Sequence, residues 1–370
     1  MNSPKLQYSR RIRKTPYTDR VESLGVSGFS VVNHTILPKG FQHTEQEDYW
    51  HLREFVQIWD VGCQRQVSLK GPDAAYLAQL LTPRNLGSAE VGQCLYAPCI
   101  DQSAGMLNDP VILMLAEDHF WFSIADSDLL LWAKGIALGM GLTVEIDEPD
   151  VWPLAVQGPL SDQLMSEVFG DRIAQLRFFN FDYFDLDGTD FLIARSGFSK
   201  QGGFEIYVHN SALCSNVWDQ IWSAGGVFNL RPGCPNLIER IEAGLLSYGN
   251  EMTRDDNPLH CGLDQFCDVN SDIHYIGREA LQSAYSLGPE RKITGIVFGE
   301  KSSGPCRYPW PVHVDGDAVG YVTSVAWSPR FERNVALAMI GIDYHAENTP
   351  VVVEAGTLRL PGVIKPTPMN

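Results

Sequence analysis

The sequence is short of basic charge and of long apolar segments. Its 370 residues carry 28 Lys and Arg against 45 Asp and Glu, which gives a formal net charge of −17 at pH 7. Binding to nucleic-acid phosphates or to an anionic membrane depends on cationic side chains, so this balance argues against both partners. The richest apolar window, 129–138, is interrupted by Lys134 and Gly135 and falls short of the roughly 20 residues that a spanning helix needs.

The sequence also lacks the patterns of secretion, disulfide frameworks and metal centres. Residues 1–20 are polar and basic, without the apolar core of a secretory signal. The eight cysteines are scattered and form neither a CxxC pair nor a Cys/His quartet at zinc spacing. We therefore expect reduced, mostly buried thiols in a cytoplasmic protein, with no metal site.

The common catalytic motifs are missing as well: the sequence has no phosphate loop, no GxSxG elbow, no HExxH and no dinucleotide fingerprint. It has the composition of a globular protein, with 44% hydrophobic and 20% charged residues. Because single cores rarely grow beyond about 250–300 residues, more than one packing unit is expected.

The hydrophobic pattern predicts an α+β fold. Strands and helices alternate irregularly, and several strands are separated by hairpin-like spacings, which does not favour a doubly wound sheet. The expected strands lie at 66–69, 94–100, 111–116, 119–124 and 154–156, and the expected helices at 50–58, 73–81, 129–139, 161–169 and 237–246.

Two features suggest how these elements are grouped. The order strand, Gly-Pro turn, helix occurs at Lys70-Gly71-Pro72 and again at Gln157-Gly158-Pro159, which hints at two related subdomains. Beyond a linker at 288–291, evenly spaced β-rich runs between 292 and 353 indicate a small closed or sandwich-like β domain.

The segment 195–207 has the highest concentration of candidate functional residues. A strand at 191–194 enters a Gly-rich turn and a second strand leaves it, with Glu205 and Tyr207 on the same face because side chains alternate along a strand. This face is either the solvent side of a hairpin or a ligand edge. In the second case the carboxylate would accept two N–H bonds from a heterocycle beside an aromatic wall.

Two other segments carry chemistry that has ordinary interpretations when each is taken alone. Asn108-Asp109-Pro110 precedes an apolar strand, where turn chemistry is common. Arg240 lies among acidic residues on the expected helix at 237–246, where a solvated face with helical ion pairs is common.

Taken in order, these segments resemble the aminomethyltransferase (T-protein) family of the glycine cleavage system, a folate-dependent family. The resemblance rests on the segments 58–61 with 67–74, 155–159, 196–207, 240–245 with 248–252, 276–281 and 323–329. Within that family the chain is more similar to the dimethylsulfoniopropionate demethylases, through the segments 13–16, 48–51, 108–112, 123–128, 195–207 and 232–240.

The departures from the T-protein pattern fall at functional positions. Where T-proteins carry two acids, this chain has Asn108-Asp109, and Gly197-Phe-Ser-Lys-Gln201 replaces their Gly-Tyr-Thr-Gly-Glu. The glutamate that binds the pterin in the family is retained as Glu205 and one Arg is retained as Arg240, while another falls at Asn236. The resemblance therefore implies that folate binding is kept and that the original chemistry is not.

The resemblance implies a three-domain arrangement with folate in a central cavity. Two interleaved α+β subdomains would cover 1–282, roughly 1–50 with 146–282 and 51–145, and a C-terminal β-barrel would cover 290–370. It further implies a methyltransferase that demethylates dimethylsulfoniopropionate, a small sulfonium compound, to 3-methylthiopropionate. Tetrahydrofolate would be the methyl acceptor and 5-methyltetrahydrofolate the product.

The resemblance also suggests a role for each site residue. A neutral thioether leaves easily, so the transfer needs in-line approach, a dry pocket and aromatic groups facing the cation more than it needs proton management. The expected catalytic residues are Asn108, Asp109 and Tyr207; the expected cofactor-binding residues are Glu205 for the pterin, Tyr96 and Phe198 as pocket walls, and Arg240 for the folate tail or the domain junction.

Three alternatives remain open from the sequence. One is a folate-dependent demethylase of another onium compound such as a betaine, because aromatic contacts do not distinguish a sulfonium from a quaternary ammonium. The second, a glycine cleavage aminomethyltransferase, is disfavoured by Asn108. The third is a non-catalytic folate-binding protein, since a fold does not imply a function. A homodimer is compatible with all of them.

Overall fold

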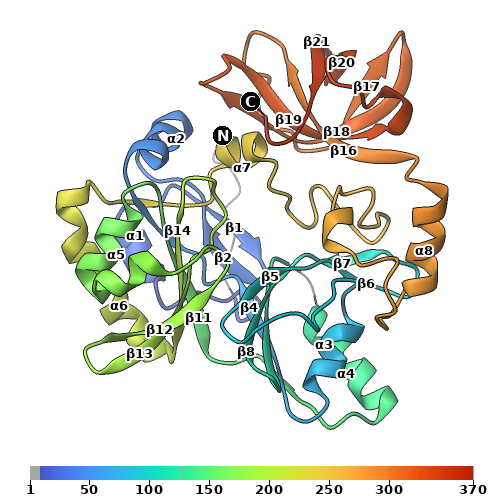
Figure 1. Cartoon of the computed structure of the whole chain (residues 1–370). Coiled ribbons are helices and arrows are strands. Elements are labelled where there is room, and N and C mark those ends of the chain that lie inside the picture. The colour runs from blue at the N-terminus through green and yellow to red at the C-terminus, as the bar shows by residue number, and fades with distance from the viewer. Residues whose placement is uncertain (1–8, 127, 370) are drawn as a thin grey trace. The chain divides into compact units, whose positions relative to one another are not determined.

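The computed structural model describes residues 9–126 and 128–369 (Figure 1), which divide into two compact units. The first consists of the described residues up to Gln66 together with Pro149–Gly197 and Gln201–Pro235; the second consists of Val67–Glu148, Phe198–Lys200 and the chain from Asn236 onward. Both units contain sheets, and helices pack beside them, so the expected α+β class is confirmed. The proposed domain boundaries stay a prediction.

A six-stranded sheet forms the centre of the first unit. Its order is β12 (Phe181–Leu186), β13 (Thr189–Ala194), β14 (Gly203–His209), β11 (Val151–Gln157), β3 (Gln57–Asp60) and β15 (Arg231–Gly233). Only β15 runs parallel to its neighbour. The unit also contains α1 (Thr18–Ser23), α2 (Glu45–Glu54), α5 (Ser161–Phe169), α6 (Cys214–Ala224) and the hairpin of β1 (Phe29–Val32) with β2 (Thr35–Pro38).

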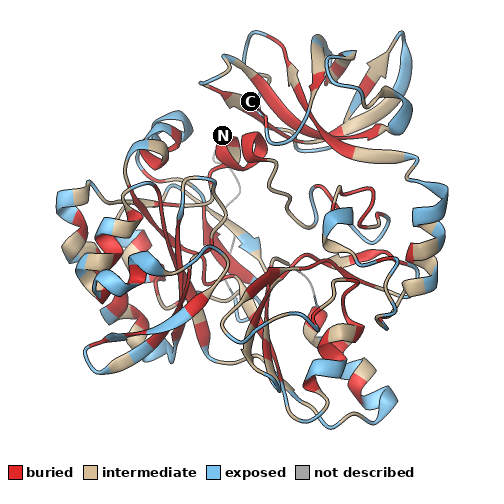
Figure 2. Ribbon diagram, in the orientation of Figure 1, coloured by how far each residue is buried: buried red, intermediate tan, exposed pale blue. Residues whose placement is uncertain are grey.

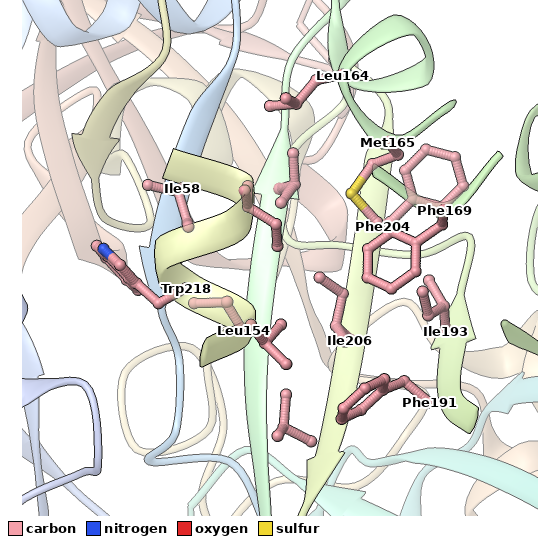
Figure 3. Packing of buried hydrophobic residues seen from close by; sticks show 14 of the residues in the cluster. Ile58, Leu154, Leu164, Met165, Phe169, Phe191, Ile193, Phe204, Ile206 and Trp218 are labelled. Atoms are coloured by element: carbon pink, nitrogen blue, oxygen red, sulfur yellow. The ribbon is translucent and has the colours of Figure 1, made fainter. Parts of the chain in front are cut away.

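The main core of this unit lies between α5, α6 and one face of the sheet. Figure 3 shows Trp218 of α6 and Met165 of α5 beside the strand residues Leu154, Phe204 and Ile206. Phe204 and Ile206 are separated by one residue, so they lie on the same face of β14. The other face of β14, which carries Glu205 and Tyr207, is therefore directed away from this core.

The second unit contains a five-stranded sheet. Its order is β10 (Glu145–Asp147), β4 (Arg65–Lys70), β9 (His119–Ile124), β8 (Val111–Ala116) and β5 (Cys94–Tyr96). Its core is completed by α3 (Ala74–Leu80) and α4 (Leu129–Met140). A short hairpin of β6 (Cys99–Ile100) with β7 (Met106–Asn108) and the helices α7 (Leu237–Ala243) and α8 (Arg278–Leu287) also belong to this unit.

The C-terminal part of the second unit is a closed barrel. Its strand order is β16 (Arg291–Phe298), β19 (Arg333–Gly341), β18 (Asp317–Ser328), β17 (Trp310–Val314), β20 (Pro350–Ala355) and β21 (Leu358–Lys365). Closure pairs every edge, and Ile296, Val312 and Val353 are among the buried side chains of its core. Buried and more exposed residues alternate along β20, whereas β19 is buried through most of its length (Figure 2). The closed form of the expected β domain is therefore confirmed.

Several element boundaries differ from the sequence prediction for identifiable reasons. The helix expected at 50–58 is α2, which begins earlier because Thr44 and Glu47 form a capping box, while Ile58 belongs to β3. The strand expected at 94–100 is two strands, and the helix expected at 237–246 ends at Ala243 because Gly244 adopts the left-handed conformation. The strand β21 was not predicted, because Pro361 and Gly362 interrupt its pattern of strand-forming residues.

No helix in the described part of the chain is long and apolar enough to cross a membrane.

The repeated Gly-Pro turn is present in both sheets. Gly71 follows β4 with φ +132° and Gly158 follows β11 with φ +126°, and a helix begins shortly after each. The backbone N–H of Gly158 donates to the carbonyl of Gly202, and a Cβ at Gly158 would lie 2.2 Å from the Phe55 carbonyl oxygen. Glycine is required here by both conformation and close approach.

Replacing Gly158 should therefore destabilise the first unit strongly. We expect Gly158→Ala to lower the free energy of unfolding by about 3 kcal/mol or more, since it combines backbone strain with overlap onto a fixed carbonyl. Gly135→Ala is the control: this glycine is exposed in α4 with no atom near the added Cβ, so a gain of about 0.5–1 kcal/mol is expected. Urea unfolding of the two variants measures both effects, and equal stabilities would contradict the analysis.

Candidate functional site

Glu205 is a buried carboxylate at the centre of the six-stranded sheet. Only 5% of the residue is exposed. Its carboxylate accepts a hydrogen bond at 2.5 Å from the Ser196 hydroxyl, and the side chain of Gln64 is a second hydrogen-bonding partner. Burial raises the pKa of Glu205, these two neutral groups lower it, and no cation in the described chain contributes to the shift.

Tyr207 lies on the same face of β14, two residues further on, and is 1% exposed. The interpretation of this face as the solvent side of a hairpin is therefore wrong, and both faces of β14 are buried. The cross-strand neighbours of Glu205 are Ala194 on β13 and Ala155 on β11. Because alanine is short and apolar, neither neighbour offers the carboxylate a hydrogen bond.

The turn between β13 and β14 is shaped by Gln157, a residue that the sequence analysis did not single out. Its side-chain amide donates to the Ser196 carbonyl at 3.0 Å. A Cβ at Gly197 would lie 2.1 Å from that amide, and a Cβ at Gly203 would lie 2.3 Å from the Val156 carbonyl. Glycines at both ends of the turn thus allow the Gln157 side chain to fill it. Phe198, a predicted pocket wall, is partly buried in this turn.

In the second unit, Asn108 ends β7 and is fully buried. Its amide nitrogen donates to the Asp126 carbonyl at 2.5 Å, and its amide oxygen accepts from the Ala125 backbone N–H at 3.2 Å. An amide serves both a carbonyl and an N–H in this way, whereas an ionised carboxylate has no proton to donate to the carbonyl. The amide at this position therefore has a local structural reason.

Asp109 and Tyr96, predicted separately, are direct partners. The Tyr96 hydroxyl donates to Asp109 Oδ2 at 2.8 Å, and the Tyr96 ring packs edge-on against Phe266. Asp109 is 7% exposed, and its Oδ1 has no hydrogen-bond partner among the described residues. Burial, the largest cause, raises the pKa of Asp109 to about 7, and the Tyr96 bond opposes the rise. The pair is a protonatable group with one free acceptor atom.

Arg240 lies on α7 in a closed polar network with the barrel. Its guanidinium binds Glu251 at 3.0 Å, the Ser324 hydroxyl at 2.7 Å and the Leu245 carbonyl at 3.1 Å. Glu251 in turn accepts hydrogen bonds from Ser324, Thr323 and the Ser247 backbone N–H. Because both charges are buried and satisfied, the solvated-face interpretation of this helix segment is wrong for Arg240.

The comparisons with known proteins place the chain in a family. Residues 17–271 match the GCVT N-terminal domain, and residues 291–369 match the glycine cleavage T-protein C-terminal barrel domain. The protein therefore belongs to the glycine cleavage T-protein family, as the sequence analysis expected.

Individual relatives refine this placement. The chain is 49% identical over 346 residues to the dimethylsulfoniopropionate demethylase DmdA of Ruegeria pomeroyi, with 94% of each chain covered. It is 29% identical over 304 residues to an aminomethyltransferase of Desulfitobacterium hafniense, with 80% of this chain and 82% of the relative covered. The crystal structure of the glycine cleavage system aminomethyltransferase T from Bartonella henselae shares the fold, with a TM-score of 0.86 at 21% identity over 96% of this chain and 98% of that one.

The Arg240 network predicts a large loss of stability when its cation is removed. Arg240→Met leaves the Glu251 carboxylate buried without its charged partner, so the free energy of unfolding should fall by about 3–5 kcal/mol. Arg333→Met is the matched control, because Arg333 lies 3.3 Å from Glu300 and both side chains are exposed; its loss should cost less than about 1 kcal/mol. A small effect of Arg240→Met in urea unfolding would contradict a structural role.

Asp109 predicts a measurable pH dependence. Its folded pKa of about 7 lies above its value in the unfolded chain, so the folded state binds the extra proton between roughly pH 4 and 7 and loses stability as the pH rises through that range. Asp109→Asn removes this penalty. The variant's stability relative to the wild type should therefore be higher at pH 8 than at pH 5, by about 2–3 kcal/mol.

Urea unfolding at the two pH values measures this difference. Asp118→Asn, at an exposed turn, controls for the general effect of removing one acid. The analysis of Asp109 is wrong if the relative stability of Asp109→Asn does not change between the two pH values.

Proposed function

We propose that this protein is a tetrahydrofolate-dependent methyltransferase that demethylates dimethylsulfoniopropionate to 3-methylthiopropionate and forms 5-methyltetrahydrofolate. The observation that carries the proposal is the 49% identity, over 94% of both chains, to a dimethylsulfoniopropionate demethylase. The retained Glu205 and the amide at Asn108 support it, because they keep a pterin partner while replacing an acid of the aminomethyltransferases.

In the proposed reaction one methyl carbon passes from sulfur to N5 of tetrahydrofolate. The C–S bond breaks with its electron pair on sulfur, an N–C bond forms, and the N5 proton is released to a base or to water. The leaving group is a neutral thioether, so it needs no proton. This is consistent with Asn108, whose amide is fully engaged with the backbone at Ala125 and Asp126.

The residues of the first unit fit a folate. Glu205 is a buried carboxylate whose partners are neutral, so it can accept further N–H bonds from the aminopyrimidine edge of a pterin. Tyr207, on the same face of β14, is proposed to present its ring to the sulfonium. Phe198, which belongs to the second unit, is proposed as a pocket wall.

In the second unit, Asn108 and Asp109 are proposed to line the reacting end and Tyr96 to be a wall. The free Oδ1 of Asp109 suits a contact with a cation or a released proton. For Arg240 we propose the junction role rather than the folate tail, since its guanidinium already binds Glu251, Ser324 and a carbonyl. A cytoplasmic location is also proposed, because the eight cysteines are free thiols.

The proposal is tested by mass spectrometry of the purified protein with tetrahydrofolate and dimethylsulfoniopropionate under anaerobic conditions. A parallel mixture contains glycine betaine instead. We expect 5-methyltetrahydrofolate and 3-methylthiopropionate in the first mixture only. Methylated folate in the betaine mixture alone would identify a different onium donor. Folate binding without any methylated product would overturn the proposed activity.

Glu205→Ala tests the pterin assignment by anaerobic titration calorimetry with tetrahydrofolate. The variant should bind tetrahydrofolate at least tenfold more weakly, since it loses charge-assisted hydrogen bonds of about 1.5–3 kcal/mol. Wild-type folate affinity in this variant would show that Glu205 does not hold the pterin.

A further inference from the structure

The Glu205 carboxylate is buried without a compensating cation. Burial of an ionised carboxylate is costly unless it is paired or well hydrogen-bonded, and the usual response is uptake of a proton. Within the described chain the groups that act on Glu205 are the Ser196 hydroxyl and the Gln64 side chain, and both are neutral. The ionisation of Glu205 therefore depends on hydrogen bonds from these groups.

The position of the Ser196 hydroxyl is fixed by contacts of the backbone around Ser196. Ser196 directly follows Arg195, whose backbone N–H and carbonyl pair with the chain at 179–180, and is itself buried. Its carbonyl accepts a hydrogen bond from the Gln157 amide at 3.0 Å. The next residue, Gly197, packs so closely against the Gln157 side chain that there is no room for a Cβ at position 197. The backbone of Ser196 is thus fixed by the packing of the turn, and its hydroxyl reaches Glu205 at 2.5 Å.

A carboxylate has about four acceptor positions, and these two partners occupy two of them. The alanines that flank Glu205 across the strands supply no side-chain donor. Acceptor capacity for two N–H donors of a ligand is left, which is the number that one edge of an aminopyrimidine presents.

We propose that Ser196, assisted by Gln64, is a positioning residue that keeps Glu205 ionised and its remaining acceptor positions directed at the pterin. The identity of the ligand rests on the function proposed above. The arrangement separates two tasks: the neutral donors hold the carboxylate, and the ligand supplies the remaining hydrogen bonds. A cationic partner would also stabilise the charge, but it would occupy the acceptor positions that the ligand needs.

The test is the pH dependence of tetrahydrofolate affinity, measured anaerobically by titration calorimetry between pH 5.5 and 9. Ser196→Ala removes a donor to the charged form, so Glu205 should take up a proton at higher pH. The pH at which folate binding is lost on acidification should move up by about one unit, which is about a tenfold weaker affinity on the acid side. Affinity should recover to within about threefold of the wild type at pH 9, where the carboxylate is again ionised.

Conservative and unrelated variants separate this role from a structural one. Ser196→Thr keeps the hydroxyl and should keep the wild-type pH profile. Gln64→Leu should move the profile in the same direction as Ser196→Ala. Ser223→Ala, an exposed serine on α6, should leave it unchanged. In turnover assays Ser196→Ala should raise the KM for tetrahydrofolate near neutral pH, with kcat at saturation within about twofold of the wild type.

Each outcome decides the proposal. A Ser196→Ala profile that lies parallel to the wild type, weaker by the same factor at every pH, would overturn it. If that variant does not fold, Gln64→Leu and Ser196→Thr decide instead: an unshifted Gln64→Leu profile or a shifted Ser196→Thr profile would overturn it. Failure of the wild-type protein to bind tetrahydrofolate would refute the proposed function rather than this inference.

Discussion

The central constraint in the first unit is that β14 is buried on both faces. One face carries Phe204 and Ile206 into the core against α5 and α6 (Figure 3), and this packing fixes the strand. The opposite face presents Glu205 and Tyr207 where solvent is excluded. A strand with one solvated face would leave its carboxylate hydrated, and hydrated hydrogen bonds contribute little net affinity. Burial favours the use of this carboxylate as an acceptor for the pterin that we propose it binds.

Burial of the carboxylate has a cost, and the surrounding chain offsets it without a counter-charge. Gln157 and the glycines at 197 and 203 shape the turn that brings the Ser196 hydroxyl to Glu205. The contrast with Arg240 and Glu251 is informative. There the chain buries a charge pair whose two members bind each other and nearby polar groups, which leaves a structural network with little capacity for a ligand. Arg240 and Glu251 thus form a structural pair, whereas Glu205 keeps acceptor positions for the pterin that we propose it binds.

The sequence predicted which residues share a face of a strand or helix, but it did not predict which other parts of the chain cover that face. Alternation along 203–209 correctly placed Glu205 and Tyr207 together, because the side-chain period of a strand is fixed locally. Whether that face meets solvent depends on chain segments distant in sequence, so periodicity left both interpretations open. The same limit applies to Arg240: the acidic neighbours on its helix were visible, whereas its partner Ser324 is 84 residues away.

The family resemblance named the residues proposed for the site, but it did not name those proposed to act through them. Ser196, Gln64 and Gln157 have no distinctive local pattern, since a serine or glutamine near a turn is ordinary.

Short and irregular elements were not predicted for a related reason. In β21, Pro361 and Gly362 weaken the local strand signal, and barrel closure through pairing with β16 and β20 supplies what the local sequence does not.

In the second unit two adjacent polar residues, Asn108 and Asp109, differ in their hydrogen bonding and in their ability to bind a proton. Asn108 is neutral, and its amide nitrogen and oxygen both form hydrogen bonds with the backbone that follows β9. It therefore fixes the position of that backbone and exchanges no proton. Asp109, one residue later, is a carboxyl held by a single phenol with one oxygen left free. Aminomethyl transfer must protonate a departing amine, whereas methyl transfer from a sulfonium only releases a proton from the acceptor nitrogen. If these residues line the reacting end as proposed, Asn108 offers no acidic proton, which methyl transfer does not need, and the ionised form of Asp109 can accept the proton that the folate nitrogen releases.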